Sequence, residues 1–375
     1  MTLRKRYKET LLFGNPDKIP MYLGLAREST LVEWRKQGLP ADRDYRVVLA
    51  ESIGISIDAI LERHKLPVSL DLIPEFEPKI LEHKGNHYIV RDWLGAITEI
   101  SDKFDMSYLK SPKDFVTRKW HKFPVETKED WQEMKKRFNP NEPGRLPSDF
   151  NEMCRKLKNR NLVEILSMNG VFWQLREWCG FENLCILMIE DPDFVHEMVE
   201  FWTEYMLKML NTVLPNIQLD SCFISEDMAY KAHSMISPAM VREFILPAYD
   251  KWIPCIKKNG CPLVEIDSDG FIDELIPLWI EAGVNCCSPI EVAAHCDIVE
   301  YRRKYGKKMA YLQGIDKRLI AQGGKSMEEH VMKIVPAMLK EGGYIPGCDH
   351  GVPPDVSWNN YIEYSRLLAK LCGWL

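Results

Sequence analysis

The second half of the chain alternates between short apolar runs and amphipathic stretches. Segments 273–282 and 326–341 repeat apolar residues with helical spacing, and stretches of this kind separate six apolar runs. The runs are LVEILSM (162–168), SCFISE (221–226), PLVEIDSD (262–269), VNCCSPI (284–290), MAYLQGI (309–315) and GYIPGCD (343–349). Strands that alternate with helices predict a parallel sheet, and six such units in about 200 residues favour its closure into a barrel. MYLGLA (21–26) supplies an early strand.

The first part of the chain is less regular. Residues 75–100 alternate in the manner of a hairpin, in which HYIV and AITEI are strands and DWLG is the turn. The stretch NPNEPGRLP (139–147) is rich in turn-forming residues and separates this part from the regular one. We therefore expect a single α/β barrel domain over residues 1–375, in which residues 1–150 include an N-terminal helical and β-hairpin elaboration.

Composition narrows the class of protein. The formal net charge is −6 and the chain has no basic run, which argues against a nucleic-acid footprint and against a polybasic membrane anchor. No apolar stretch reaches the roughly 18 to 20 residues that span a bilayer. The N-terminal residues lack the apolar core of a signal peptide. Eleven cysteines without a CxxC pair indicate reduced thiols, so we expect a cytoplasmic protein that binds neither membrane nor nucleic acid.

Polar or reactive residues follow each of the six predicted strands. They are Asn169, Glu226 with Asp227, Asp267 with Asp269, Glu291, Gln313 with Asp316, and Cys348 with Asp349 and His350. One such residue is an ordinary helix N-cap. Six consecutive strands that end in this way predict a shared site, because the carboxyl ends of barrel strands meet at one mouth.

Four of these residues suggest a metal site. Asp267 and Asp269 are two apart and face the same side of a strand, as does Glu265. Glu291 and Cys348 end other strands, and this many negative groups at one point repel each other unless a cation is present. Zinc accepts both oxygen and sulfur ligands. The alternative is structural: Asp269 caps a helix that starts at Phe271, and Cys348 is a small buried apolar residue.

Several segments resemble the uroporphyrinogen decarboxylase superfamily, in order and over nearly the whole chain. They are FGNPDKIP (13–20), MNGVFWQLREWCGFE (168–182), SEDMAYKAHSMISPAMVREFILP (225–247), GIDKRLI (314–320) and GGYIPGCDHGVPPDVSWNNYIEY (342–364). The resemblance implies a (β/α)8 barrel. Decarboxylases of the family carry an arginine-rich segment near the N-terminus, where this chain reads GLARESTLVEWRKQG (24–38) with Arg27 and Arg35 but without that signature. This departure counts against a porphyrinogen substrate.

The other branch of the superfamily contains corrinoid-dependent methyltransferases. Their zinc ligands resemble His-x-Cys-Gly and a cysteine in Pro-Gly-Cys, and this chain has Asp267-x-Asp269-Gly270 and Pro346-Gly347-Cys348 in those places. Related cobalamin-independent methionine synthases add a glutamate 22 residues after the first cysteine, the separation of Asp269 and Glu291. The resemblance thus implies a zinc ion held by Asp267, Asp269, Glu291 and Cys348. An oxygen-rich site suits Lewis-acid activation of an ether oxygen.

The resulting hypothesis is an O-demethylase component, a methyltransferase that acts on a methoxylated, aromatic substrate. The resemblance implies that the methyl group passes to the cob(I)alamin of a separate corrinoid protein, because the chain lacks an Asp-x-His-x-x-Gly segment. Such barrels are monomers or homodimers. Glu226, Asp227 and His233 are candidates for proton delivery or substrate contact, with His350 as a second acid.

Asn169, Trp173 and Lys231 are candidates for substrate binding, and Trp173 with Phe172 would form a wall for a planar ring. Structural roles remain open for these residues. Lys231 would pair with Asp227 on a helix, His233 would be an ordinary hydrogen-bonding residue, and the two aromatic rings would pack in the core. Two other functions also remain open: a decarboxylase of a smaller acid, and a degenerate barrel that binds a ligand without turnover.

Overall fold

A parallel seven-stranded sheet forms the centre of the molecule. The computed structural model describes residues 1–111 and 113–375. The strand order is β1-β6-β7-β8-β9-β10-β11, and all neighbours are parallel. The strands are β1 (Arg63–Lys65), β6 (Val163–Asn169), β7 (Ser221–Ser225), β8 (Leu263–Asp267), β9 (Cys286–Ser288), β10 (Ala310–Leu312) and β11 (Tyr344–Ile345). All six strands predicted in the second half are confirmed; β6 is as long as its apolar run, and the other five are shorter than theirs.

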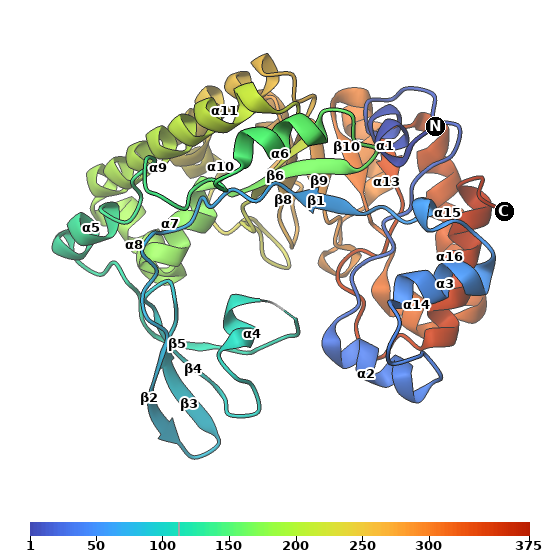
Figure 1. Cartoon of the computed structure of the whole chain (residues 1–375), viewed down its shortest axis with the longest axis horizontal. Coiled ribbons are helices and arrows are strands. Elements are labelled where there is room, and N and C mark those ends of the chain that lie inside the picture. The colour runs from blue at the N-terminus through green and yellow to red at the C-terminus, as the bar shows by residue number, and fades with distance from the viewer. Residues whose placement is uncertain (112) are drawn as a thin grey trace.

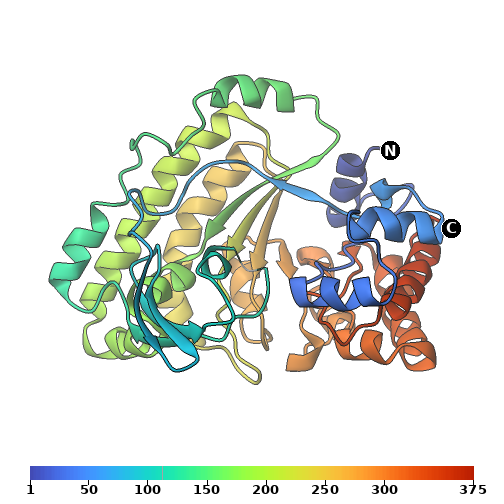
Figure 2. The same cartoon turned by 60° about the horizontal axis from the view of Figure 1, so that its bottom comes forward.

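The sheet curls through the molecule, and most of the helices pack around its outer face (Figures 1 and 2). The helices are α1 (Leu3–Leu11), α2 (Glu28–Lys36), α3 (Tyr45–Ile53), α4 (Ser107–Lys110), α5 (Lys128–Lys135), α6 (Phe150–Leu157), α7 (Val171–Cys179), α8 (Phe181–Glu190), α9 (Pro192–Val213), α10 (Pro238–Met240), α11 (Leu246–Lys258), α12 (Ile276–Ala282), α13 (Ile298–Tyr305), α14 (Lys317–Gln322), α15 (Gly324–Glu341) and α16 (Trp358–Leu371). The predicted α/β class is therefore confirmed. None of these helices, within residues 1–111 and 113–375, has the length and apolar character that a bilayer-crossing segment requires.

The extended segment 21–26 lies between the two edge strands of the sheet. Met21 forms a parallel bridge with Ile60, just before β1, and the Tyr22 N–H donates to the Pro346 carbonyl oxygen, just after β11, at 2.9 Å. A Cβ atom on Gly347 would collide with the Tyr22 carbonyl oxygen. A glycine at 347 therefore lets the two backbones approach.

Alternate residues of the strands contribute to two cores. Leu263 and Ile345 face inward, where they pack with Leu3, Tyr7 and Leu11 of α1. Helix α1 therefore fills the amino-terminal end of the curled sheet. Residues of the opposite register belong to the larger outer core between sheet and helices; among them are Ile224, Val264 and Cys348.

The elaboration is a separate antiparallel sheet of order β2-β3-β4-β5. It comprises β2 (Lys79–Lys84), β3 (His87–Arg91), β4 (Ile97–Ser101) and β5 (Lys119–Lys122). The predicted hairpin is β3 paired with β4, and two further strands flank it. Between β4 and β5 the chain carries α4, which lies beneath the main sheet in the view of Figure 1.

Hydrogen bonds attach α4 and the segment that follows it to the start of α2. Asp114 accepts hydrogen bonds from the Ser29 N–H at 2.8 Å and from its hydroxyl at 3.1 Å, and the Tyr108 hydroxyl donates to Glu28 at 2.5 Å. Asp114 thereby caps a helix N-terminus from a distant part of the chain. Residues of the elaboration are brought in this way to the carboxyl end of the main sheet.

Candidate functional site

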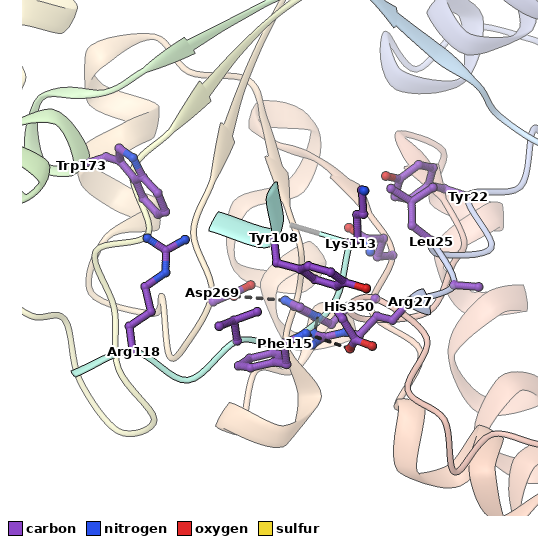
Figure 3. Close-up of a pocket in the computed structure, with 15 residues that line it drawn as sticks. Tyr22, Leu25, Arg27, Tyr108, Lys113, Phe115, Arg118, Trp173, Asp269 and His350 are labelled. Atoms are coloured by element: carbon purple, nitrogen blue, oxygen red, sulfur yellow. Dashed lines mark hydrogen bonds and ion pairs between the residues drawn. The ribbon is translucent and has the colours of Figure 1, made fainter. Parts of the chain in front are cut away.

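A cavity of about 540 Å³ lies beyond the carboxyl ends of the strands. Its walls combine four aromatic rings with three cationic side chains and the pair Asp269–His350. The rings are those of Tyr22, Tyr108, Phe115 and Trp173, and the cations are Arg27, Lys113 and Arg118. Figure 3 shows Trp173 and Tyr22 on opposite sides of the cavity, with Asp269 and His350 between them. The size and the aromatic lining suit a small planar ligand.

His350 lies between a carboxylate and a guanidinium. Its Nε2 is 3.2 Å from Asp269 Oδ2, and Arg27 Nη2 donates toward its Nδ1 at 3.3 Å (Figure 3). An accepting Nδ1 places the proton of the neutral ring on Nε2. The hydrogen bond to Asp269 raises the pKa of His350, and burial opposes that shift. His350, predicted as a second acid, therefore lies in the cavity with an orienting carboxylate.

The predicted catalytic residue Glu226 is fully buried and holds the start of α7. Its carboxyl accepts hydrogen bonds from the Val171 N–H at 2.9 Å and the Trp173 N–H at 3.1 Å, and the Tyr249 hydroxyl also donates to it. Burial raises the pKa of Glu226 to about 7, against the opposing effect of these donors. A Cβ on Gly170 would collide with the Glu226 carboxyl group, so the glycine makes this cap possible.

Asp227 pairs with a residue that the sequence did not indicate. Arg176 donates to the Asp227 carboxylate at 3.1 Å and to its backbone oxygen at 2.9 Å. Burial raises the pKa of Asp227, and the Arg176 charge opposes that shift. The Arg176 guanidinium also lies 4.5 Å from the ring centre of Trp173, so it connects the β7 loop to the cavity wall.

The structure gives different surroundings to the predicted substrate-binding residues. Trp173 lines the cavity, whereas Phe172 is buried in the outer core. Asn169 donates to the Gln174 side chain at 3.0 Å and is not among the residues that line this cavity.

Lys231 and His233 are both exposed, in a turn closed by the bridge between Ala229 and Ser234. This region is a loop, so the helical pairing of Lys231 with Asp227 is wrong.

Asp267 and Glu265 project to the inner side of β8. Glu265 accepts from Arg63 Nη1 at 2.6 Å and from the Ser288 hydroxyl at 2.6 Å, so its oxygens are occupied. The Asp267 side chain has no hydrogen-bond partner among residues 1–111 and 113–375. Burial, and next the negative charge of Asp269, raise the pKa of Asp267 well above its ordinary value. Asp267 is thus a carboxyl group that favours its protonated form.

Glu291 is held by a lysine and a backbone amide. It accepts from Lys317 Nζ at 3.2 Å and from the Gly270 N–H at 3.0 Å. Lys317 also lies 3.5 Å from the buried carboxylate of Asp349. Burial raises the pKa of Asp349 to about 6, and the Lys317 charge opposes that shift. A lysine therefore supplies the positive charge that the sequence assigned to a metal ion at Glu291.

Cys348 faces away from the cavity. It belongs to the outer core with Tyr361 and Tyr364, and burial raises the pKa of its thiol to about 12. In the part of the chain that the structure describes, no three His, Cys, Asp or Glu side chains gather as metal ligands. Asp267, Asp269, Glu291 and Cys348 as they lie here therefore do not fit one zinc ion. The structural alternative for Cys348, a small buried apolar residue, agrees with this placement. The structural alternative for Asp269, the cap of a helix that starts at Phe271, is wrong because α12 begins only at Ile276.

Sequence reasoning missed the cavity residues of the elaboration. These residues are Tyr108, Lys113, Phe115 and Arg118. Hydrogen bonds of Asp114 and of its neighbours hold their segment against α2. No local pattern marks them, since the contact joins segments that are about 85 residues apart. Arg27 was noted in the sequence only as part of a missing signature, yet it lines the cavity and contacts His350.

Comparison with known proteins places the chain in a family and gives a related fold. The uroporphyrinogen decarboxylase (URO-D) family model matches residues 122–366. A solved methyltransferase from Methanosarcina mazei superimposes with a TM-score of 0.59 at 12% identity, covering 99% of each chain. A B12-independent methionine synthase from Shewanella sp. W3-18-1, in complex with selenomethionine, gives a TM-score of 0.39 at 12% identity over 61% of this chain and 67% of that one. No curated protein matches the sequence.

Proposed function

We propose that this chain, which belongs to the uroporphyrinogen decarboxylase (URO-D) family, is a methyltransferase acting on a methoxylated aromatic acid. The methyl group would pass to the reduced cobalt of a corrinoid on a separate protein, making the chain an O-demethylase component. The proposal rests on the aromatic, cationic cavity that contains the Asp269–His350 pair. The fold likeness to a methyltransferase agrees with it but does not assign an activity at 12% identity.

The cavity favours a planar substrate that carries a negative charge. Trp173 and Phe115 offer ring faces for stacking, and Arg27, Lys113 and Arg118 offer positive charge on the same cavity. Burial lowers the pKa of Arg27 and of Arg118. Charges in such a partly desolvated place attract an anion more strongly than charges in water. A carboxylate on the aromatic ring would meet this requirement.

His350 is our proposed proton donor. An aryl methyl ether is a poor electrophile because the departing phenolate oxygen carries a developing negative charge. In the proposed step the C–O bond breaks as the methyl group passes to the nucleophile, the electron pair stays on the oxygen, and the Nδ1 proton of the charged His350 ring moves to that oxygen. Asp269, 3.2 Å from Nε2, orients the imidazole ring and stabilises its charged form. The corrinoid, when its protein is bound at the mouth, supplies the nucleophile that accepts the methyl group.

Two finer points of the proposal, the closure of the barrel and the zinc ion, rest on different observations. We propose that the sheet closes as a (β/α)8 barrel with residues 21–26 as the eighth strand, supported by the bonds of Met21 and Tyr22 to opposite edges. Zinc remains a prediction from the resemblance to methyltransferases. Its proposed ligands do not gather in this arrangement, so we assign no step to it.

A methyl-transfer assay tests the proposal. The chain is mixed with a reduced corrinoid protein and with methoxybenzoates or the matching methoxybenzenes, and the cobalt absorbance is followed. We expect transfer from the acids, a loss of about 100-fold or more in kcat for His350→Gln, and an unchanged rate for His196→Gln, whose exposed side chain pairs with Glu243. Absence of transfer from every donor, with a folded chain, would refute the function.

One observation favours a second function, the decarboxylation of a small aromatic acid. A decarboxylase needs cationic groups that hold a carboxylate, and Arg27, Lys113 and Arg118 are such groups. The same samples distinguish the two reactions, because decarboxylation releases carbon dioxide without a corrinoid protein. Turnover that continues without the corrinoid protein would assign the second function.

A further inference from the structure

A second cavity, of about 570 Å³, lies at the opposite end of the strands from the candidate site. It is formed where the chain enters β6, β7 and β8, by the end of α6, residues 214–218, residues 258–260 and Arg4 of α1. In Figure 1, α6 and α1 lie above the strands, whereas α4 and α2, which flank the first cavity, lie below them. The two cavities are therefore separate.

Five cationic side chains line this second cavity, and no carboxylate is among its lining residues. They are Arg4, Arg155, Lys158, Arg160 and Lys258. Arg4 and Arg160 share the single buried carboxylate of Asp220, at 2.7 and 2.8 Å. Within residues 1–111 and 113–375, the other three have no ion-pair partner. A chain with a net charge of −6 thus concentrates positive charge at one concave place.

Arg160 is a fixed part of this cavity. Its side chain is only 4% exposed, and it donates to the backbone oxygens of Leu157 and Gln218 at 3.0 and 2.7 Å. Its Nε atom has no hydrogen-bond partner in the described chain. The contacts with Leu157 and Gln218 fix the guanidinium in the wall of the cavity, and a fixed, planar guanidinium is suited to phosphate oxygens.

The rest of the lining suits the remainder of a nucleotide. Asn216, Gln218 and Asn259 provide amide groups, and Leu214, Pro215 and Ile217 provide an apolar side. The volume lies in the range of small-molecule sites. We propose that this cavity binds a phosphate-bearing small molecule through its polyphosphate group, with a nucleotide as the ligand that fills it.

Calorimetric titration at low ionic strength, without divalent cations, tests the site. The probes are tripolyphosphate, ATP and adenosine, and poly-L-glutamate serves as a carboxylate polyanion. The first variant combines Arg155→Gln, Lys158→Gln and Lys258→Gln, whose side chains are exposed and have no ion pair to lose. The matched control combines Arg35→Gln, Lys333→Gln and Lys370→Gln. These side chains are also exposed, and the control variant removes the same charge as the first variant.

We expect ATP and tripolyphosphate to bind and to raise the Tm by mass action, and adenosine alone not to bind. The first variant should weaken binding at least about tenfold, because each exposed charge contributes modestly, and the control should not. Tighter binding of ATP than of tripolyphosphate identifies a nucleotide, and equal binding identifies the phosphate group alone. The proposal is overturned by no binding of either, by equal weakening in the control, or by stronger binding of poly-L-glutamate.

Discussion

The substitution Glu226→Gln separates a structural from a catalytic role for this residue. Glu226 is one of the carboxyls that the sequence marked as catalytic, but in the fold it is fully buried beneath the start of α7. Glutamine keeps one oxygen that can accept from Val171, but it places an NH2 group where the carboxyl accepts the Trp173 N–H at 3.1 Å. The variant therefore removes the titrating group and one hydrogen bond of the cap.

The expected effect depends on pH. Burial raises the Glu226 pKa from its ordinary 4.5 to about 7, so the folded chain holds this proton more tightly than the unfolded chain. The free energy of unfolding then falls as the pH rises from 4.5 toward 7. A shift of about 2.5 units corresponds to about 3 kcal/mol. Glutamine does not titrate, so the stability advantage of the wild type over the variant should shrink by about 3 kcal/mol across this window.

Urea denaturation of both proteins at about pH 5 and about pH 8 measures this difference. The wild type should be the more stable at the lower pH, and the difference should be much smaller at the higher pH. The variant should retain methyl transfer far better than His350→Gln, because Glu226 does not line the cavity. A pH-independent difference would refute the raised pKa. Complete loss of activity in a stable variant would restore the catalytic role.

Three further substitutions test other parts of the site. Lys317→Met should lower the free energy of unfolding by about 2 kcal/mol in urea titrations, and more at high than at low pH, because it leaves the buried carboxylate of Asp349 unpaired. Arg63→Met should cost about 3 kcal/mol by the same measurement, and Glu265→Gln in the same chain should recover part of the loss, since Arg63 is the ion-pair partner of Glu265. Cys348→Ser should lower stability by about 1 to 3 kcal/mol by placing a hydroxyl in an apolar core. Elemental analysis should find the same metal content as in the wild type, whereas a loss of zinc would make Cys348 a ligand after all.

The strands, and the polar residues that follow each of them, could be predicted from the sequence because the periodicity of apolar residues is a local pattern. The direction in which each side chain points could not be predicted in this way. Most of these parallel strands carry apolar residues on both faces, so for a strand such as β11 the sequence does not show which register points inward. In the structure Leu263, Glu265 and Asp267 share the inner register of β8, whereas the inner register of β11 contains Ile345 and leaves Cys348 outward. One step of register thus separates Asp267, on the inner side, from Cys348, on the outer side, although the sequence placed both in one site.

The partners of the polar residues were also beyond the sequence. Arg176 and Lys317 were visible as ordinary charged residues of helices, and nothing local connects them with Asp227 or Glu291. Their pairing depends on where the loops after neighbouring strands converge. The exposed turn that carries His233 shows the opposite case, in which a residue close in sequence to the site lies at the surface.

This pairing changes what the acidic cluster means. The sequence called for a cation because several carboxylates at one mouth repel each other. In the fold, side chains of the same chain pair with most of these carboxylates and neutralise their negative charge. The pairs are Glu265 with Arg63, Asp227 with Arg176, Glu291 and Asp349 with Lys317, and Asp269 with His350. Asp267 is left, and its raised pKa favours the neutral form. Because these groups need no further cation to coexist, clustered acidity here is weak evidence for a metal. Among the cations of the cavity, Arg118 has a partner of its own in Asp92 at 3.9 Å, and the Asp114 carboxylate also lines the cavity. Arg27 and Lys113 then give the cavity the positive character that an anionic substrate requires.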